Sequence, residues 1–132
     1  MKRFGLSSVE RLKSRIDFEK LYTSGKVILS MNKKIKAVYL IEKVTGSGNI
    51  KIATVVSGKA GNAVWRNRLK RLLRTSYRQN KKNLYALCLL KKIVLKIIFS
   101  PYHFNEKNNK LVMLDDIIPG VKDVLFKIER SL

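Results

Sequence analysis

The chain has 132 residues, 45% of them hydrophobic, so it is long enough and apolar enough to bury one core in a single domain spanning residues 1–132. It carries 29 Lys and Arg residues against nine Asp and Glu residues, which gives a formal net charge of +20 at pH 7. Repulsion among so many like charges opposes a compact state, so the excess indicates a polyanionic partner. Nucleic acid is the first candidate, and an anionic membrane surface is the second.

Rare residue types exclude several classes of protein. Cys88 is the single cysteine and His103 the single histidine, so the sequence has neither a disulfide framework nor a Cys or His metal cluster. The apolar stretch at residues 84–99 is interrupted by three lysines, which does not fit a membrane span. Residues 1–5 include two charged side chains, Lys2 and Arg3, and no apolar run follows them, which does not fit a secretory signal. We therefore expect a cytoplasmic protein without a membrane partner.

Local patterns in the first half of the chain predict one helix and three strands. A capping signal at Ser14 and Asp17, followed by apolar residues at helical spacing, predicts a helix over residues 14–24. Short apolar runs predict strands over residues 27–31, 35–41 and 50–56. The turn sequence GSGN at residues 46–49 predicts that the second and third strands pair as an antiparallel hairpin.

In the second half, residues 61–80 form the longest predicted helix, with Asn62 as its N-cap. Residues 84–90 are apolar and fit an extension of this helix, whereas residues 93–99 predict a buried strand. After a polar loop at residues 102–110, apolar residues at helical spacing predict a final helix. The predicted order is α-β-β-β-α-β-α, an α+β sandwich of a small sheet and packed helices.

The helix at residues 61–80 separates an apolar stripe from a basic face. On a helical wheel, Trp65, Leu69 and Tyr77 share the apolar arc, with Arg68 at its edge. The opposite arc holds five cations and an asparagine: Arg66, Asn67, Lys70, Arg71, Arg74 and Arg78. No acid occurs between residues 43 and 105, although an ordinary solvated helix would mix Lys with Glu. Phosphates would relieve this repulsion, because a guanidinium pairs bidentately with phosphate oxygens.

Residues 61–74, GNAVWRNRLKRLLR, resemble the signature of the protein subunit of bacterial ribonuclease P. That signature is a Gly-Asn-Ala-Val lead, one variable residue, Arg-Asn-Arg, and an Ile/Leu-Lys-Arg continuation. Upstream, residues 11–13 (RLK) and 17–22 (DFEKLY) are similar to the N-terminal segment of the family. The resemblance covers residues 11–78. It implies the same order of elements, with a left-handed β-α-β crossover around the basic helix, a hand that general rules of topology would not suggest.

The resemblance implies a role in removing the 5′ leader from precursor tRNA. In the family, a large RNA subunit with bound Mg²⁺ hydrolyses the phosphodiester bond, and the protein is the non-catalytic subunit of this endoribonuclease. The implied partners are therefore the RNA subunit and precursor tRNA, with no obligate protein partner. The resemblance implies no catalytic residue, no metal ligand and no cofactor bound by the protein alone.

The resemblance, together with the basic arc, also assigns site residues. The RNA-binding positions are Arg66, Asn67, Arg68, Lys70, Arg71, Arg74, Arg78 and Lys59. The positions of the leader-binding cleft are Phe18, Tyr22, Tyr39 and Ser57. Aromatic faces stack on any base and cations follow any phosphate, so such a cleft suits a leader of arbitrary sequence. From spacing alone, Phe18 and Tyr22 would be assigned to the core. The chain departs from the family pattern at Ala53, Val55 and Gly58.

Three other functions compete with this interpretation. A ribosomal or ribosome-associated RNA-binding protein fits the composition equally well, but the ordered motif argues against it. A cationic membrane-surface protein needs a separate amphipathic helix, whereas here the apolar arc is needed for the core. A stand-alone nuclease needs clustered metal-binding acids, and the adjacent Asp115 and Asp116 fit helix-capping residues better.

Overall fold

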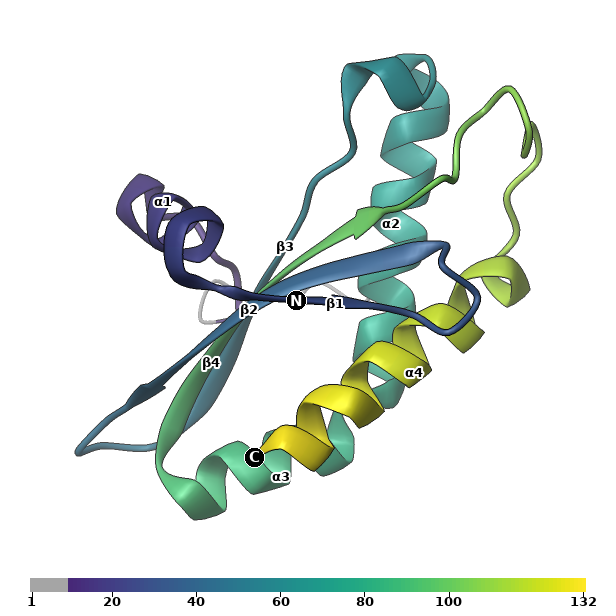
Figure 1. Ribbon diagram of the computed structural model, residues 1–132. Coiled ribbons are helices and arrows are strands. Elements are labelled where there is room, and N and C mark those ends of the chain that lie inside the picture. Colours follow the sequence, from purple (N-terminus) through teal and green to yellow (C-terminus); the bar gives the residue numbers. More distant parts are fainter. Residues whose placement is uncertain (1–9) are drawn as a thin grey trace, which may run out of the picture.

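The computed structural model describes residues 10–132, which form a four-stranded sheet with helices on both faces (Figure 1). The elements are α1 (Arg15–Ser24), β1 (Lys26–Leu29), β2 (Ile35–Lys43), β3 (Asn49–Thr54), a 3₁₀ helix (Gly58–Ala60), α2 (Ala63–Asn80), α3 (Lys82–Lys91), β4 (Ile93–Pro101) and α4 (Leu114–Ser131). The predicted α+β class is confirmed. The expectation of no secretory signal concerns residues outside the described part of the chain.

The sheet order is β1-β2-β4-β3, so the predicted hairpin between the second and third strands is wrong. β2 pairs antiparallel with β4, and β3 pairs parallel with β4. β4 takes the position between them because it buries apolar side chains on both faces, such as Ile97 on one and Ile98 on the other. The parallel neighbours β3 and β4 are joined through α2 and α3, so a β-α-β crossover runs through the basic helix. Its left hand stays an expectation from the resemblance.

Residues 84–90 belong to a separate helix, α3, and do not extend α2. The N-cap of α2 is Asn62, as predicted, and its side-chain oxygen accepts a hydrogen bond from the Trp65 backbone N–H at 2.8 Å. Lys81 alone separates the two helices. The break lets Leu84 and Cys88 of α3 enter the same core as α2.

The two faces of the sheet carry cores of different size. On one face, α2, α3 and α4 cover the main core; on the other, α1 covers a small cluster of four buried residues: Leu12, Leu21, Val38 and Ile98. Figure 1 shows α1 and α2 on opposite sides of the sheet. Leu21 is the one buried residue of α1. Its burial contributes about 1.5–3 kcal/mol, so apolar contact holds α1 only weakly.

The last helix, α4, confirms the predicted C-terminal helix. The Asp116 carboxylate accepts a hydrogen bond from the Met113 backbone N–H at 2.8 Å, so this acid caps the helix as expected. Farther along α4, the Asp123 carboxylate accepts from the Met31 N–H at 2.6 Å, and Lys127 donates to the Leu29 carbonyl at 3.0 Å. Within residues 10–132, no helix combines the length and hydropathy that crossing a bilayer requires.

Candidate nucleic-acid interface

The basic face of α2 lacks acidic partners. Within residues 10–132, no carboxylate lies within salt-bridge distance of a Lys or Arg of α2; the ion pairs of this part of the chain lie elsewhere. Asn67 and Arg71 are exposed, and Arg66, Lys70, Arg74 and Arg78 are half-buried. An unpaired row of cations is energetically costly and attracts phosphates.

Arg74 lies where α2 meets the sheet. Its Nη1 donates to Oγ1 of Thr54, at the end of β3, at 3.3 Å. Burial, and then the neighbouring guanidinium groups of Arg11 and Arg71, lower the pKa of Arg74 below its ordinary value. An arginine remains protonated at neutral pH even so. Arg11 and Arg71 therefore lie near enough to repel the Arg74 guanidinium, and a bound anion would relieve this repulsion.

The loop before α4 packs against the opposite flank of α2. The Trp65 indole N–H donates to the Asn109 carbonyl at 2.9 Å. Arg68 donates from Nε to the Val112 carbonyl at 2.8 Å, and its Nη2 lies 3.8 Å from Met113 Sδ. The resemblance assigns Arg68 to RNA binding; in the structure its Nε is bonded to this loop, so that nitrogen has a structural partner, and the assignment to RNA binding stays a prediction.

We predict that Arg68→Ala lowers the free energy of unfolding by about 1–2 kcal/mol, because a charged donor to a backbone carbonyl is lost. Arg71→Ala is the matched control, because Arg71 is exposed. The control should change the free energy of unfolding by no more than about 0.5 kcal/mol. Urea denaturation followed by circular dichroism measures both values. Equal losses in the two variants would contradict a structural role for Arg68.

A groove of about 460 Å³ runs from α1 across the edge of β3 to α2. It is lined by Arg11, Leu12, Lys13, Phe18, Ile52, Ala53, Thr54 and Arg74. Phe18 is half-buried and packs against the small core under α1. An aromatic ring on one wall and a guanidinium on the other are the groups that bind a single-stranded nucleic acid. Ala53, a departure from the family pattern, makes part of the floor apolar.

Arg11 and Lys13 reach this groove because the chain before α1 adds itself to the edge of β3. The Leu12 N–H donates to the Ile52 carbonyl at 2.9 Å, and the Ile52 N–H donates to the Glu10 carbonyl at 2.8 Å. Sequence reasoning did not include Arg11 and Lys13 among the site residues. The signal that could have found them is the family-like RLK at residues 11–13.

The two tyrosines predicted for the cleft do not line this groove. Tyr22 is 58% exposed and lies one turn beyond Phe18 on α1. Tyr39 is 3% exposed, packs in the main core on the other face of the sheet, and its hydroxyl lies 3.2 Å from Ser131 Oγ of α4. Alternate residues of a strand face opposite ways, and it is Val38 that faces α1. The expectation that Tyr39 is a third cleft aromatic is therefore corrected.

Ser57 and Lys59 lie at the N-terminal end of α2. The Ser57 hydroxyl accepts from the Lys59 N–H at 3.2 Å and so caps the 3₁₀ helix that contains Gly58. Lys59 is exposed and lines a second cavity, of about 560 Å³, together with residues 60–61 and part of the loop before α4. The structure thus groups Phe18 with Arg74, and places Ser57 and Lys59 at a different location.

A small sheet covered on both faces, an acid-free arginine face and a groove walled by an aromatic and a guanidinium are typical of α+β proteins that bind nucleic acid. The family model for Ribonuclease P matches residues 6–112, which is most of the chain. The chain therefore belongs to the ribonuclease P protein family.

Individual relatives agree with this assignment. The chain is 37% identical over 75 residues to a ribonuclease P protein component of Alkaliphilus oremlandii, covering 57% of this chain and 61% of that one. It is 41% identical over 69 residues to the component of Listeria welshimeri, covering 52% and 55%. The matched segment thus spans about six tenths of the length of these curated relatives.

Solved structures show the same fold over nearly the whole chain. The ribonuclease P protein of Thermotoga maritima superposes with a TM-score of 0.64 at 25% identity, covering 92% of this chain and 96% of that one. The protein of Staphylococcus aureus superposes with a TM-score of 0.65 at 22% identity, covering 90% and 94%. The latter comparison supports the fold alone.

Proposed function

We propose that this chain is the protein subunit of a ribonuclease P ribonucleoprotein and binds both the catalytic RNA and the 5′ leader of precursor tRNA. Family membership supports the proposal, and one observation of the structure carries it. The groove between Phe18 and Arg74 opens beside the acid-free face of α2. Arg74 belongs to both the groove and the basic face, so a base-stacking ring and a row of phosphate-binding cations are linked through this residue.

In the proposed complex, the protein binds and positions RNA and performs no chemistry. Arg66, Lys70, Arg71, Arg74 and Arg78 contact phosphates of the RNA subunit. The leader lies in the groove, with a base against Phe18 and its phosphates near Arg11 and Arg74. RNA-bound Mg²⁺ supplies the metal chemistry of phosphodiester hydrolysis. Within residues 10–132, no group of three or more His, Cys, Asp or Glu side chains could hold a metal ion.

A reconstitution experiment tests this proposal. We expect the purified protein, treated with nuclease to remove RNA, to leave precursor tRNA intact at any Mg²⁺ concentration. Added to ribonuclease P RNA at low Mg²⁺, it should increase cleavage at the junction of leader and mature tRNA. A structured ribosomal RNA fragment of equal length should compete weakly for the protein. Cleavage by the RNA-free protein would contradict the non-catalytic role, and preferential binding of the ribosomal fragment would favour the ribosomal alternative.

A further inference from the structure

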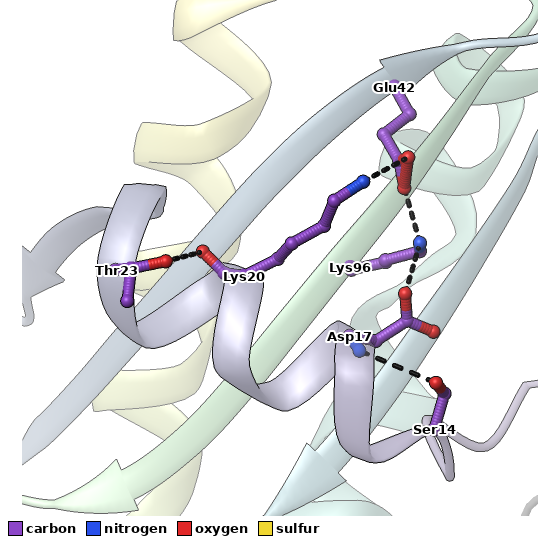
Figure 2. A network of polar contacts seen from close by, with 6 residues as sticks. All are labelled: Ser14, Asp17, Lys20, Thr23, Glu42 and Lys96. Atoms are coloured by element: carbon purple, nitrogen blue, oxygen red, sulfur yellow. Dashed lines mark hydrogen bonds and ion pairs between the residues drawn. The ribbon is translucent and has the colours of Figure 1, made fainter.

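A network of four charged side chains connects α1 to the sheet (Figure 2). Lys96 of β4 donates from Nζ to Oδ1 of Asp17, in the first turn of α1, at 2.8 Å. The same Nζ donates to Oε1 of Glu42 on β2. Glu42 in turn lies 4.0 Å from Nζ of Lys20, one turn farther along α1. The charges alternate in sign, and they link two residues of α1 to the two central strands.

Lys96 is the most enclosed member of the network, with a side chain that is 12% exposed. Burial disfavours its charged form, but hydrogen bonds with Asp17 and Glu42 outweigh that cost and raise the pKa of Lys96. The two carboxylates contact one ammonium and so lie close to each other. Without the lysine they would repel each other at a partly desolvated place, and α1 would move away from the sheet.

The position of α1 decides the shape of the groove. Phe18 follows Asp17 directly and forms the α1 wall, whereas Arg74 on the far side of β3 forms the opposite wall. Apart from Leu21, no residue of α1 is buried, and Phe18 is half-buried against the same small cluster, so the apolar contacts that hold the helix are few. On β4, Lys96 precedes Ile98 by two residues on the face that α1 covers. The network therefore acts on the same helix that presents the ring.

We propose that Lys96, acting through Asp17 and Glu42, is a positioning residue that holds α1 so that Phe18 faces Arg74 across the groove. The inference rests on the proposed function and deepens it, because it adds residues that determine how well the groove discriminates precursor from mature tRNA. None of the three network residues named here lines the groove itself.

Replacing the acids of the network by amides separates two explanations. Electrostatic attraction alone and positioning of Phe18 predict opposite changes in the affinity for precursor tRNA. In a protein of charge +20, loss of any surface carboxylate should strengthen RNA binding if electrostatic attraction alone matters. If the network positions Phe18, then Asp17→Asn and Glu42→Gln should instead weaken binding of precursor tRNA. Glu42→Gln leaves the sequence of α1 unchanged, so the helix itself cannot account for its effect.

Glu19→Gln is the matched control. Glu19 is also an acid of α1, but its partner is Arg15 in the same helix, at 3.3 Å, and both side chains are mostly exposed. With ribonuclease P RNA present, we expect the precursor-to-mature affinity ratio to fall about threefold to tenfold in Asp17→Asn and Glu42→Gln, because these residues are coupled in one network. The ratio should stay unchanged in Glu19→Gln. Lys96→Arg keeps the positive charge, so it should lower the precursor-to-mature affinity ratio less than Lys96→Met does.

Hydrogen exchange of the α1 amides gives a readout that needs no RNA. Exchange should be faster in Asp17→Asn and Glu42→Gln than in the wild type and in Glu19→Gln, because α1 detaches more often. Unchanged exchange, or an unchanged affinity ratio in both network variants, would overturn the positioning role. A wild-type chain that binds precursor and mature tRNA equally would instead refute the leader groove, and so the proposed function itself.

Discussion

Raising monovalent salt from about 50 to about 200 mM should weaken binding of the ribonuclease P RNA roughly 250-fold. The reason is the release of counterions when cations of α2 neutralise phosphates. Five cations remain on the basic face, once Arg68 is set aside as bonded to the loop before α4: Arg66, Lys70, Arg71, Arg74 and Arg78. At about −0.8 per contact, a plot of log K against log salt concentration should have a slope of about −4.

Variants that each remove one positive charge show which cations contribute to the salt dependence of RNA binding. Arg71→Ala should make the slope shallower by about 0.8, because Arg71 is an exposed member of the face. Lys122→Ala removes the same formal charge from α4, where Lys122 is exposed and lies outside α2 and the groove, and should leave the slope unchanged. Filter binding or fluorescence titration at several salt concentrations provides the slopes. A nearly flat plot for the wild type would refute the electrostatic role of α2.

The second large effect is expected for Phe18→Ala. Loss of one base stack should weaken precursor tRNA binding by about 1–3 kcal/mol, or about 5-fold to 150-fold, while mature tRNA is bound almost as before. The quantity to measure is the precursor-to-mature affinity ratio with the RNA subunit present. Tyr22→Ala should lower this ratio less, because Tyr22 does not line the groove.

Phe18 also packs against the small core under α1, so controls must separate stacking from stability. Phe18→Tyr keeps the ring and should preserve the ratio. Phe18→Leu keeps apolar bulk without an aromatic face and should lower the ratio nearly as much as alanine does. If alanine instead lowers thermal stability and both affinities together, Phe18 acts only in the core.

Much of the candidate interface could be predicted because it depends on local sequence. The capping residues Ser14 and Asn62 begin the two helices at the expected positions, and helical periodicity alone places Arg71 and Arg74 on one face. The ordered motif at residues 61–74 then indicated the family, which the comparisons confirm. Arg68, at the boundary of the apolar stripe, is where periodicity is least decisive, and there a distant loop determines its contacts.

Residues a few positions apart in the sequence predict helices α1, α2 and α4, the basic face of α2 and the family, whereas they do not show the break that separates α3 from α2. Three features depend on tertiary contacts: β4 separates β2 from β3, Tyr39 faces the main core, and Arg11 joins Phe18 and Arg74 in one groove. Strand pairing brings together residues that are far apart in the sequence, so local patterns do not determine it. A strand such as β4, apolar on both faces, is most stable between two neighbours, and shifting a strand residue by one position moves its side chain to the other face.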